Sequence, residues 1–205
     1  MRFRDFESKV QELSFFNLNN IRKLDPGFHR RQLVDWQQRG YIKPFVGGTY
    51  ILADREVDEG LLFMAANQIY PPSYVSLESA LAYHQVIPES VLGVTSVSSR
   101  KTQQFESTWG QFSYRSIKPA FMFGYQVVKD KPTQMYLVAS LEKAILDYVY
   151  LNPHVTTVED FDGLRWNKDV LSSLGESEGF IRYLQLFDKH ALENRVNELM
   201  RYIDA

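Results

Sequence analysis

Hydrophobic residues within positions 17–52 recur first at helical spacing and then at strand spacing. Leu18 and Ile21, three residues apart, lie on one face of a short helix. Asp-Pro-Gly at residues 25–27 ends this helix, because proline cannot continue a helix and glycine permits the chain to reverse. The pattern therefore predicts a short helix followed by a tight turn.

A second helix is predicted from about Phe28 to Arg39. Its inner face is formed by Leu33 and Trp36, and Gly40 occupies the position expected of a helix-ending glycine. Two short β-rich runs follow, separated by the pair Gly47-Gly48, which suits a tight hairpin turn. Helix, turn, helix and hairpin is the order of elements in a winged helix-turn-helix.

The segments on either side of this pattern suggest where a domain begins and ends. Residues 5–13 read as a helix whose apolar stripe, ending at Leu13, would close a three-helix core. The charged segment 53–59 follows the hairpin and is the expected boundary. We therefore predict a winged helix-turn-helix DNA-binding domain over residues 1–55 and a second domain over residues 56–205.

The remainder mixes helices with short strands, which places the chain in the α+β class. An amphipathic helix is expected at residues 61–69, and Ser76 is a candidate N-cap for a helix over residues 77–84. Ser140 caps an apolar helix, residues 141–151, expected at the domain centre, and the last fifty residues look helical. The strand-like runs in between are 94–98, 104–106, 111–117, 123–128 and 134–139. We predict a larger mixed α/β domain with a short-stranded sheet and a buried central helix.

Composition narrows the class of protein. Hydrophobic residues make up 44% of the chain and aromatic residues 14%, which is ample for an ordered core. The chain contains no cysteine, so disulfides and thiolate-based zinc or redox sites are excluded. No run approaches the roughly 18 apolar residues that span a bilayer, and the start lacks the apolar segment of a signal peptide. We expect a cytoplasmic protein with no membrane association.

The charge of the chain is distributed unevenly. The net charge is −2, yet residues 1–52 hold nine Lys and Arg against five Asp and Glu, a net charge of +4. The rest of the chain therefore carries −6. A basic module on an acidic body is expected where only the first part approaches phosphates.

The candidate DNA-binding residues fall into two groups by task. Arg and Gln side chains read guanine and adenine through paired hydrogen bonds, whereas Lys side chains and the hairpin backbone hold phosphates. The base-reading candidates, at the N-terminal half of the second helix, are His29, Arg30, Arg31 and Gln32, and the phosphate-binding candidates are Arg22, Lys23 and Lys43. The alternative is a solvated helix face whose arginines are neutralised by Asp35. The turn, the glycine stop and the hairpin, all in register, favour DNA.

Signatures of catalysis and of metal or cofactor binding are missing from the sequence. The four histidines show no metal-ligand spacing, and His84 on an apolar helix face is expected to be a hydrogen-bonded core residue. Residues 159–163 lack the alternating oxygen ligands of a calcium loop, and Gly47-Gly48 is not followed by the Lys-Ser/Thr of a phosphate loop. We predict no catalytic residue, no metal, no cofactor and no enzymatic activity.

One charged pair lies within the apolar helix. Lys143 and Asp147 are four residues apart and share a helix face. The favoured interpretation is a buried or half-buried structural pair, and the alternative is a polar surface that a partner protein reads.

Three blocks of the sequence resemble the AbiEi-type antitoxins of bacterial abortive-infection (type IV toxin–antitoxin) systems. The first is the winged helix ending at residues 40–52, GYIKPFVGGTYIL. The second, residues 74–88, is similar to that family's helix after the wing, and the third, residues 138–147, is similar to its Glu-Lys-Ala-x-x-Asp helix. The wing departs from many relatives, because its Val46-Gly-Gly is less basic, which weakens the case for phosphate contacts from the wing.

The resemblance implies a DNA-binding repressor and antitoxin that autoregulates its operon in phage defence. It would bind promoter inverted repeats in double-stranded DNA and counter a nucleotidyltransferase-like toxin without a stable complex, with antitoxicity in the C-terminal domain. We expect a monomer or weak dimer in solution that pairs on DNA. The alternatives are a stand-alone transcriptional regulator, or a protein-interaction module whose winged helix does not bind DNA.

Overall fold

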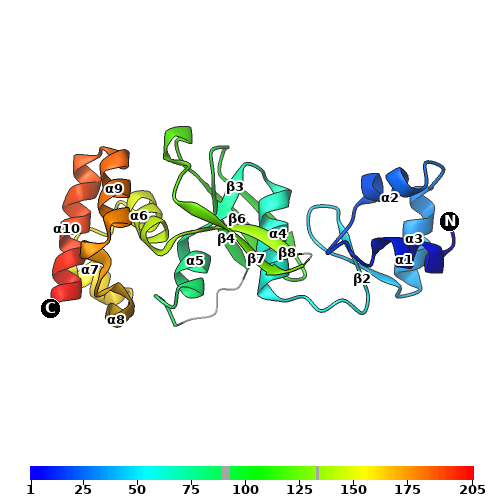
Figure 1. Cartoon of the computed structure of the whole chain (residues 1–205), viewed down its shortest axis with the longest axis horizontal. Coiled ribbons are helices and arrows are strands. Elements are labelled where there is room, and N and C mark those ends of the chain that lie inside the picture. The colour runs from blue at the N-terminus through cyan, green and yellow to red at the C-terminus, as the bar shows by residue number, and fades with distance from the viewer. Residues whose placement is uncertain (89–92, 133) are drawn as a thin grey trace.

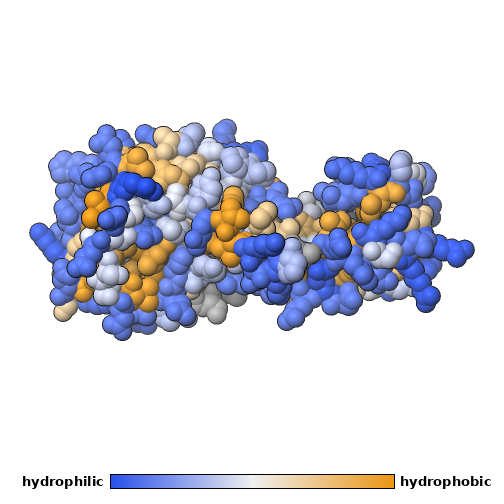
Figure 2. Space-filling model, viewed as in Figure 1, coloured by the Kyte–Doolittle hydropathy of each residue, from blue (hydrophilic) through white to orange (hydrophobic). Residues whose placement is uncertain are grey.

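A computed structural model describes residues 1–88, 93–132 and 134–205. The chain is elongated, with its N-terminal helices and first hairpin at one end, a sheet with helices α4 and α5 in the middle, and helices α6 to α10 at the other end (Figure 1). The two termini lie at opposite ends of the molecule (Figure 1). Figure 2 shows two lobes joined by a narrower waist, and hydrophilic residues dominate the smaller lobe in this view. None of the described helices is long and apolar enough to cross a bilayer.

The first 52 residues form three helices and a hairpin around a core of their own. The elements are α1 (Phe3–Val10), α2 (Leu18–Leu24), α3 (Arg30–Gln38), β1 (Ile42–Pro44) and β2 (Tyr50–Leu52). The core residues are Phe6, Val10, Phe16, Ile21, Phe28, Leu33, Trp36, Ile42 and Leu52. The expected helix over 5–13 is displaced toward the N-terminus, and Leu13 is 37% exposed, so its predicted place on the apolar stripe is wrong. The reason is that the helix ends at Val10, after which the chain turns away from the core.

The predicted stop signals of both helices are confirmed. Asp25 ends α2, and its carboxylate accepts a hydrogen bond from the Gly27 N–H at 3.1 Å, which holds the turn. Gly40 follows α3 with a φ of +71°, and its N–H donates to the Gln37 carbonyl at 3.0 Å. The Tyr41 N–H donates to the Trp36 carbonyl at 2.9 Å, which completes a glycine-ended helix terminus.

The β1–β2 hairpin turns at the predicted glycine pair. Gly47 and Gly48 both have positive φ, +60° and +78°, as a two-residue turn of this kind requires. Phe16, between α1 and α2, also bridges to β2: its N–H donates to the Tyr50 carbonyl at 2.9 Å, and the Tyr50 N–H donates back at 2.7 Å. The hairpin is thereby tied to the helices.

A six-stranded sheet forms the middle of the molecule, in the order β5-β6-β4-β3-β8-β7. Strand β3 lies inside the sheet, antiparallel to β4 and parallel to β8. The sequence predicted no strand at Tyr74 and Val75, which precede the helix expected over residues 77–84, so this strand was missed. The strands are β3 (Ser73–Val75), β4 (Val94–Ser98), β5 (Gln103–Ser107), β6 (Gly110–Ser116), β7 (Tyr125–Lys131) and β8 (Gln134–Ala139).

Helices surround the sheet and complete a mixed α and β architecture. They are α4 (Glu59–Ile69), α5 (Leu77–Tyr83), α6 (Leu141–Leu151), α7 (Val158–Gly163), α8 (Lys168–Leu171), α9 (Glu178–Phe187) and α10 (His190–Asp204), with short 3₁₀ turns at Pro119–Phe121 and Leu174–Glu176. The Ser140 hydroxyl accepts from the Lys143 N–H and caps α6, as predicted. Ser76 does not cap α5 with its side chain, because its hydroxyl instead donates to Asp147 Oδ2 at 2.9 Å.

The hydrophobic residues of the chain form two clusters. The smaller one belongs to the first 52 residues, and the larger one runs through the sheet and the C-terminal helices. Phe45, Val46 and Ile51 of the hairpin region belong to the larger cluster. The N-terminal pattern is therefore not complete in itself, although a division at residue 55 stays our prediction.

Candidate nucleic-acid interface

Helix α3 is fixed by an aromatic cluster on its inner face. The Trp36 ring is buried, with its centroid 4.8 Å from that of Phe6, 5.1 Å from that of Phe28 and 5.3 Å from that of Phe3. Leu33 is buried on the same face, as predicted. Because aromatic burial stabilises a single orientation, the opposite face of α3 points into solvent.

The outward face of α3 begins with two unpaired cations. Arg30 and Arg31 are exposed, and the first turn of α3 contains no acidic residue. Within the part of the chain that the structure describes, neither guanidinium forms an ion pair, and Asp35 does not neutralise them. The helix dipole adds positive potential at this end. An anion approaching α3 therefore meets the N-terminal turn first.

Two further predicted cations lie on the preceding helix. Arg22 and Lys23 occupy the last turn of α2, are exposed, and form no ion pair with any described residue. His29 is exposed at the N-cap position of α3, where its side chain makes no capping hydrogen bond. These side chains, with those of Arg30 and Arg31, remain available to a ligand.

Two of the predicted residues are engaged by the protein itself. Gln32 is half-buried, and its Nε2 donates to the Met1 carbonyl at 3.5 Å. Lys43 is exposed on β1, and its Nζ donates to the Ala53 carbonyl at 2.6 Å. Each would have to exchange a hydrogen bond within the protein for one with DNA, so we expect smaller contributions from them.

Sequence reasoning missed one basic position beside α3. Arg2 is exposed and precedes Phe3, whose ring centroid lies 4.5 Å from that of Tyr41 and 5.3 Å from that of Trp36. These ring contacts bring the start of α1 against the end of α3. The sequence shows only a basic residue next to an aromatic one, and residue spacing does not predict that this segment lies beside the end of α3.

The residues that lead into the tip of the hairpin pack against the rest of the chain, whereas the tip glycines, Gly47 and Gly48, are exposed. Phe45 is 6% and Val46 2% exposed. The Phe45 ring centroid lies 5.6 Å from that of Phe15 and 6.4 Å from that of Trp109, which precedes β6. A Cβ at Gly47 would stand 3.3 Å from the side chain of Ile69, at the end of α4. Phe45 and Val46 are therefore unavailable for contact with DNA.

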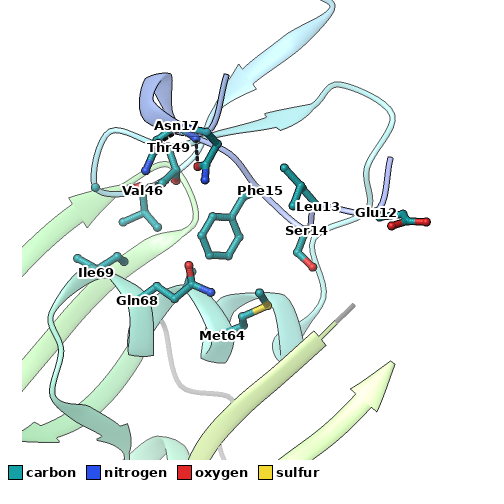
Figure 3. Close-up of a pocket in the computed structure, with 13 residues that line it drawn as sticks. Glu12, Leu13, Ser14, Phe15, Asn17, Val46, Thr49, Met64, Gln68 and Ile69 are labelled. Carbon is teal, nitrogen blue, oxygen red and sulfur yellow. Dashed lines mark hydrogen bonds between the residues drawn. The ribbon is translucent and has the colours of Figure 1, made fainter. Parts of the chain in front are cut away.

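A cavity of about 390 Å³ lies at this junction (Figure 3). Its lining combines residues from the α1–α2 connection, the hairpin and α4, and Phe15 projects toward Gln68 and Met64 (Figure 3). Glu12 is its only charged lining residue among those described. The cavity is therefore a poor site for nucleic-acid phosphates.

Polar contacts reinforce the junction on its other side. Asp58 caps α4 by accepting from the Leu61 N–H at 2.8 Å, pairs with Lys131, and accepts from Gln134 Nε2 at 3.2 Å. Burial alone would raise the pKa of Asp58, but these hydrogen bonds outweigh it and hold the pKa below the ordinary 3.8. Arg55 donates to the Gln11 carbonyl at 2.8 Å. The Asp58 contacts thus hold the start of α4 against β7 and β8, and the Arg55 hydrogen bond ties the segment before α4 to the end of α1.

The Lys143–Asp147 pair lies deep in the larger core. Both side chains are 0% exposed, and Asp147 Oδ2 also accepts from the Tyr74 hydroxyl at 2.8 Å. Burial raises the pKa of Asp147 and lowers that of Lys143. The interpretation as a buried structural pair is confirmed, and the alternative of a surface read by a partner is wrong, because no solvent reaches either group. His84 similarly binds the Ala139 carbonyl through Nε2 at 2.8 Å.

The described residues contain no group of three or more His, Cys, Asp or Glu arranged to hold a metal ion. Comparison with known proteins adds no further guide: neither a protein-family model nor a curated protein sequence matches the chain.

Proposed function

We propose that residues 1–52 form a winged helix-turn-helix and that the protein is a transcriptional repressor of double-stranded DNA. The observation that carries this proposal is the outward face of α3, where Arg30 and Arg31 are exposed and unpaired at the N-terminal turn. The three helices, the hairpin and its bridge at Phe16 supply the frame of such a domain.

In this proposal the N-terminal turn of α3 enters the major groove. Arg30 and Arg31 read guanine edges through paired hydrogen bonds, with His29 beside them. Arg22 and Lys23, at the end of α2, hold the phosphates that flank the groove. The hairpin contributes through Lys43 and not through Phe45 or Val46, which are buried at the junction.

The acidic remainder of the chain, residues 53–205, which we call the body, determines how two copies of the N-terminal region bind one operator. Residues beyond 52 carry a net charge of −6, so they stay away from the phosphates. The Phe45 ring contacts and the hydrogen bond from Arg55 to the Gln11 carbonyl hold the body against the N-terminal helices, so the body moves with α3. Two copies on an inverted repeat therefore present two copies of α3 in a defined geometry, with half-sites about 34–36 Å apart.

We further propose that the protein autoregulates its operon and acts as an antitoxin in the cytoplasm against a nucleotidyltransferase-like toxin, with residues 56–205 responsible. What supports this part is the order and spacing of the three sequence blocks that resemble AbiEi-type antitoxins. The third block coincides with the end of β8 and the first part of α6, the helix that holds the buried Lys143 and Asp147.

DNA binding is tested by titrating the full-length protein onto a fragment of its own promoter, with a shuffled fragment of equal length as the control. We expect tighter binding to the promoter, and an affinity that falls as salt rises, because phosphate contacts release counterions. Equal affinity for both fragments would refute sequence-specific recognition, and no binding to either would refute the proposed function.

The antitoxin activity is tested separately by expressing the full-length protein beside the neighbouring gene of the operon. Rescue of growth that persists when Arg30 and Arg31 are both replaced by Ala would place antitoxicity outside the DNA-binding face. Absence of toxicity from the neighbouring gene would leave the stand-alone regulator as the better description.

A further inference from the structure

Strand β7 forms one edge of the six-stranded sheet and pairs with β8 alone among the described strands. The residues of β7 are exposed except for Val128, which is half-buried, so no described helix or loop covers this edge. An uncovered edge strand offers backbone groups to any strand that can align with it.

The outward backbone groups of β7 can be identified from its ladder with β8. The Ser140 N–H donates to the Gly124 carbonyl at 2.9 Å, and hydrogen-bonded pairs alternate along an antiparallel ladder. Gln126 and Val128 therefore bond to β8, whereas the N–H and C=O groups of Tyr125, Val127 and Lys129 point to the free edge.

The partner residue of Val127 supports this assignment independently. Leu137 lies opposite Val127 in register, and its N–H donates to Asn67 Oδ1 at 2.6 Å. The Leu137 carbonyl accepts from Asn67 Nδ2 at 3.3 Å. The backbone of Leu137 thus faces away from β7, as it must if Val127 does not bond to it.

An apolar patch lies along the same edge. Opposite residues of a ladder share a face, so Tyr125, Val127 and Lys129 lie on one face with Leu137 and Met135. Val127 and Met135 are each 62% exposed. One face of the Tyr125 ring rests on Tyr74, with ring centroids 4.8 Å apart, and 40% of the residue remains exposed.

We propose that this edge binds a second copy of the chain, through antiparallel pairing of β7 with its counterpart about a two-fold axis at Val127. In that register Val127 faces its own counterpart, and Tyr125 faces Lys129 of the other copy, twice by symmetry. The alignment joins the two apolar patches into one and brings the Lys129 ammonium group toward the uncovered face of the Tyr125 ring of the other copy.

The ends of β7 limit the pairing to this short stretch. The ladder with β8 shifts register between Lys129 and Lys131, and Lys131 is engaged by Asp58. Such irregularities and charges end strand pairing. Residues 125–129 remain, and their centre is Val127. A contact of five residues per strand belongs to the class of small, weak interfaces, so the dimer forms at high protein concentration.

Disulfide trapping tests the register. The chain has no cysteine, so Val127→Cys introduces a single thiol. Directly opposite residues in a hydrogen-bonded antiparallel pair have Cα atoms about 5.5 Å apart, within the range of a disulfide. We expect Val127→Cys to form a covalent dimer on mild oxidation at least ten times faster than Leu186→Cys, a control at a residue 53% exposed on α9. Equal rates, or no dimer from Val127→Cys, would overturn the register.

Sedimentation equilibrium tests the association itself. We expect the wild-type mass to rise above 23.9 kDa with concentration. Val127→Pro removes only an outward N–H, and Val127→Lys places two like charges at the axis, so both variants are expected to stay monomeric with unchanged circular dichroism. The control Leu186→Lys is expected to associate like the wild type. A wild-type chain that stays at 23.9 kDa contradicts the proposal, and this includes the case in which a strand of another protein binds the edge. Association of Val127→Lys to the same extent as the wild type contradicts the proposal as well.

Discussion

In the first 52 residues the cations of α2 and α3 lie in solvent and form no ion pair with any residue that the structure describes, whereas the body encloses its central cation, Lys143, with Asp147 and removes both from water. The difference follows from solvation. Water stabilises an exposed guanidinium, so Arg30 and Arg31 can remain unpaired until an anion arrives. A buried ammonium has no such support and requires a carboxylate, which in turn requires the Tyr74 and Ser76 hydroxyls. One region is thus arranged for a ligand and the other for its own stability.

The largest effect should come from breaking the buried pair. Asp147→Ala leaves Lys143 buried without a counter-charge, and we expect it to lower the free energy of unfolding by about 3–5 kcal/mol. Urea denaturation of the full-length protein measures this. The double variant Lys143→Met with Asp147→Leu should lie closer to wild type, because it removes both charges together.

The matched control for that prediction is the exposed pair of Arg201 and Glu198, whose charged atoms are 2.7 Å apart. Glu198→Ala should lower the free energy of unfolding by less than about 1 kcal/mol, because solvent screens a pair at the surface. If Asp147→Ala and Glu198→Ala lower the free energy of unfolding by the same amount, burial does not explain the effect of breaking the Lys143–Asp147 pair.

A second prediction concerns the junction between the two regions. Phe45→Ala removes a buried ring that contacts Phe15 and Trp109, and we expect a loss of about 3 kcal/mol in the free energy of unfolding. X-ray scattering should also show a wider range of shapes, since the hairpin tip no longer holds the N-terminal helices to the body. An unchanged stability would mean that the tip contributes no packing energy.

A smaller effect is expected at the start of α4. Asp58→Ala removes the N-cap of α4 and the partner of Lys131. We expect it to lower the free energy of unfolding by about 1 kcal/mol at pH 7. The pKa of Asp58 is depressed in the folded state, so its contribution is fully present above 3.8 and is lost as the pH falls through the lower folded-state pKa. Unfolding curves of wild type and variant should therefore converge in acid. A difference that grows in acid would contradict the sign.

Much of the fold could be predicted because local signals agreed with one another. Gly40 and the glycine pair of the hairpin require positive φ, and only glycine adopts it readily, so these positions identified a helix end and a turn. Strands β4, β5 and β8 followed from runs of residue types that favour strands. Strand β3 did not, because its three residues are all buried and show no alternation.

The junction was beyond sequence reasoning for a different reason. Phe45 and Val46 looked like the tip of a free wing, and nothing in their spacing shows that Phe15 and Trp109 would cover them. Ser76 matched the pattern of an N-cap, yet its hydroxyl bonds to Asp147, 71 residues away. Contacts between distant segments determine which of two locally reasonable roles a residue takes.

The central claim, that the unpaired arginines of α3 recognise DNA, is tested most directly by the affinity of Arg30→Ala/Arg31→Ala for the promoter fragment. We expect specific binding to weaken by about 2–6 kcal/mol, since each arginine makes one base contact. The control Arg182→Ala/Arg201→Ala removes the same charge from exposed positions of the body and should bind nearly as wild type does. If the folded Arg30→Ala/Arg31→Ala variant binds the promoter as tightly as wild type, α3 is not the recognition helix.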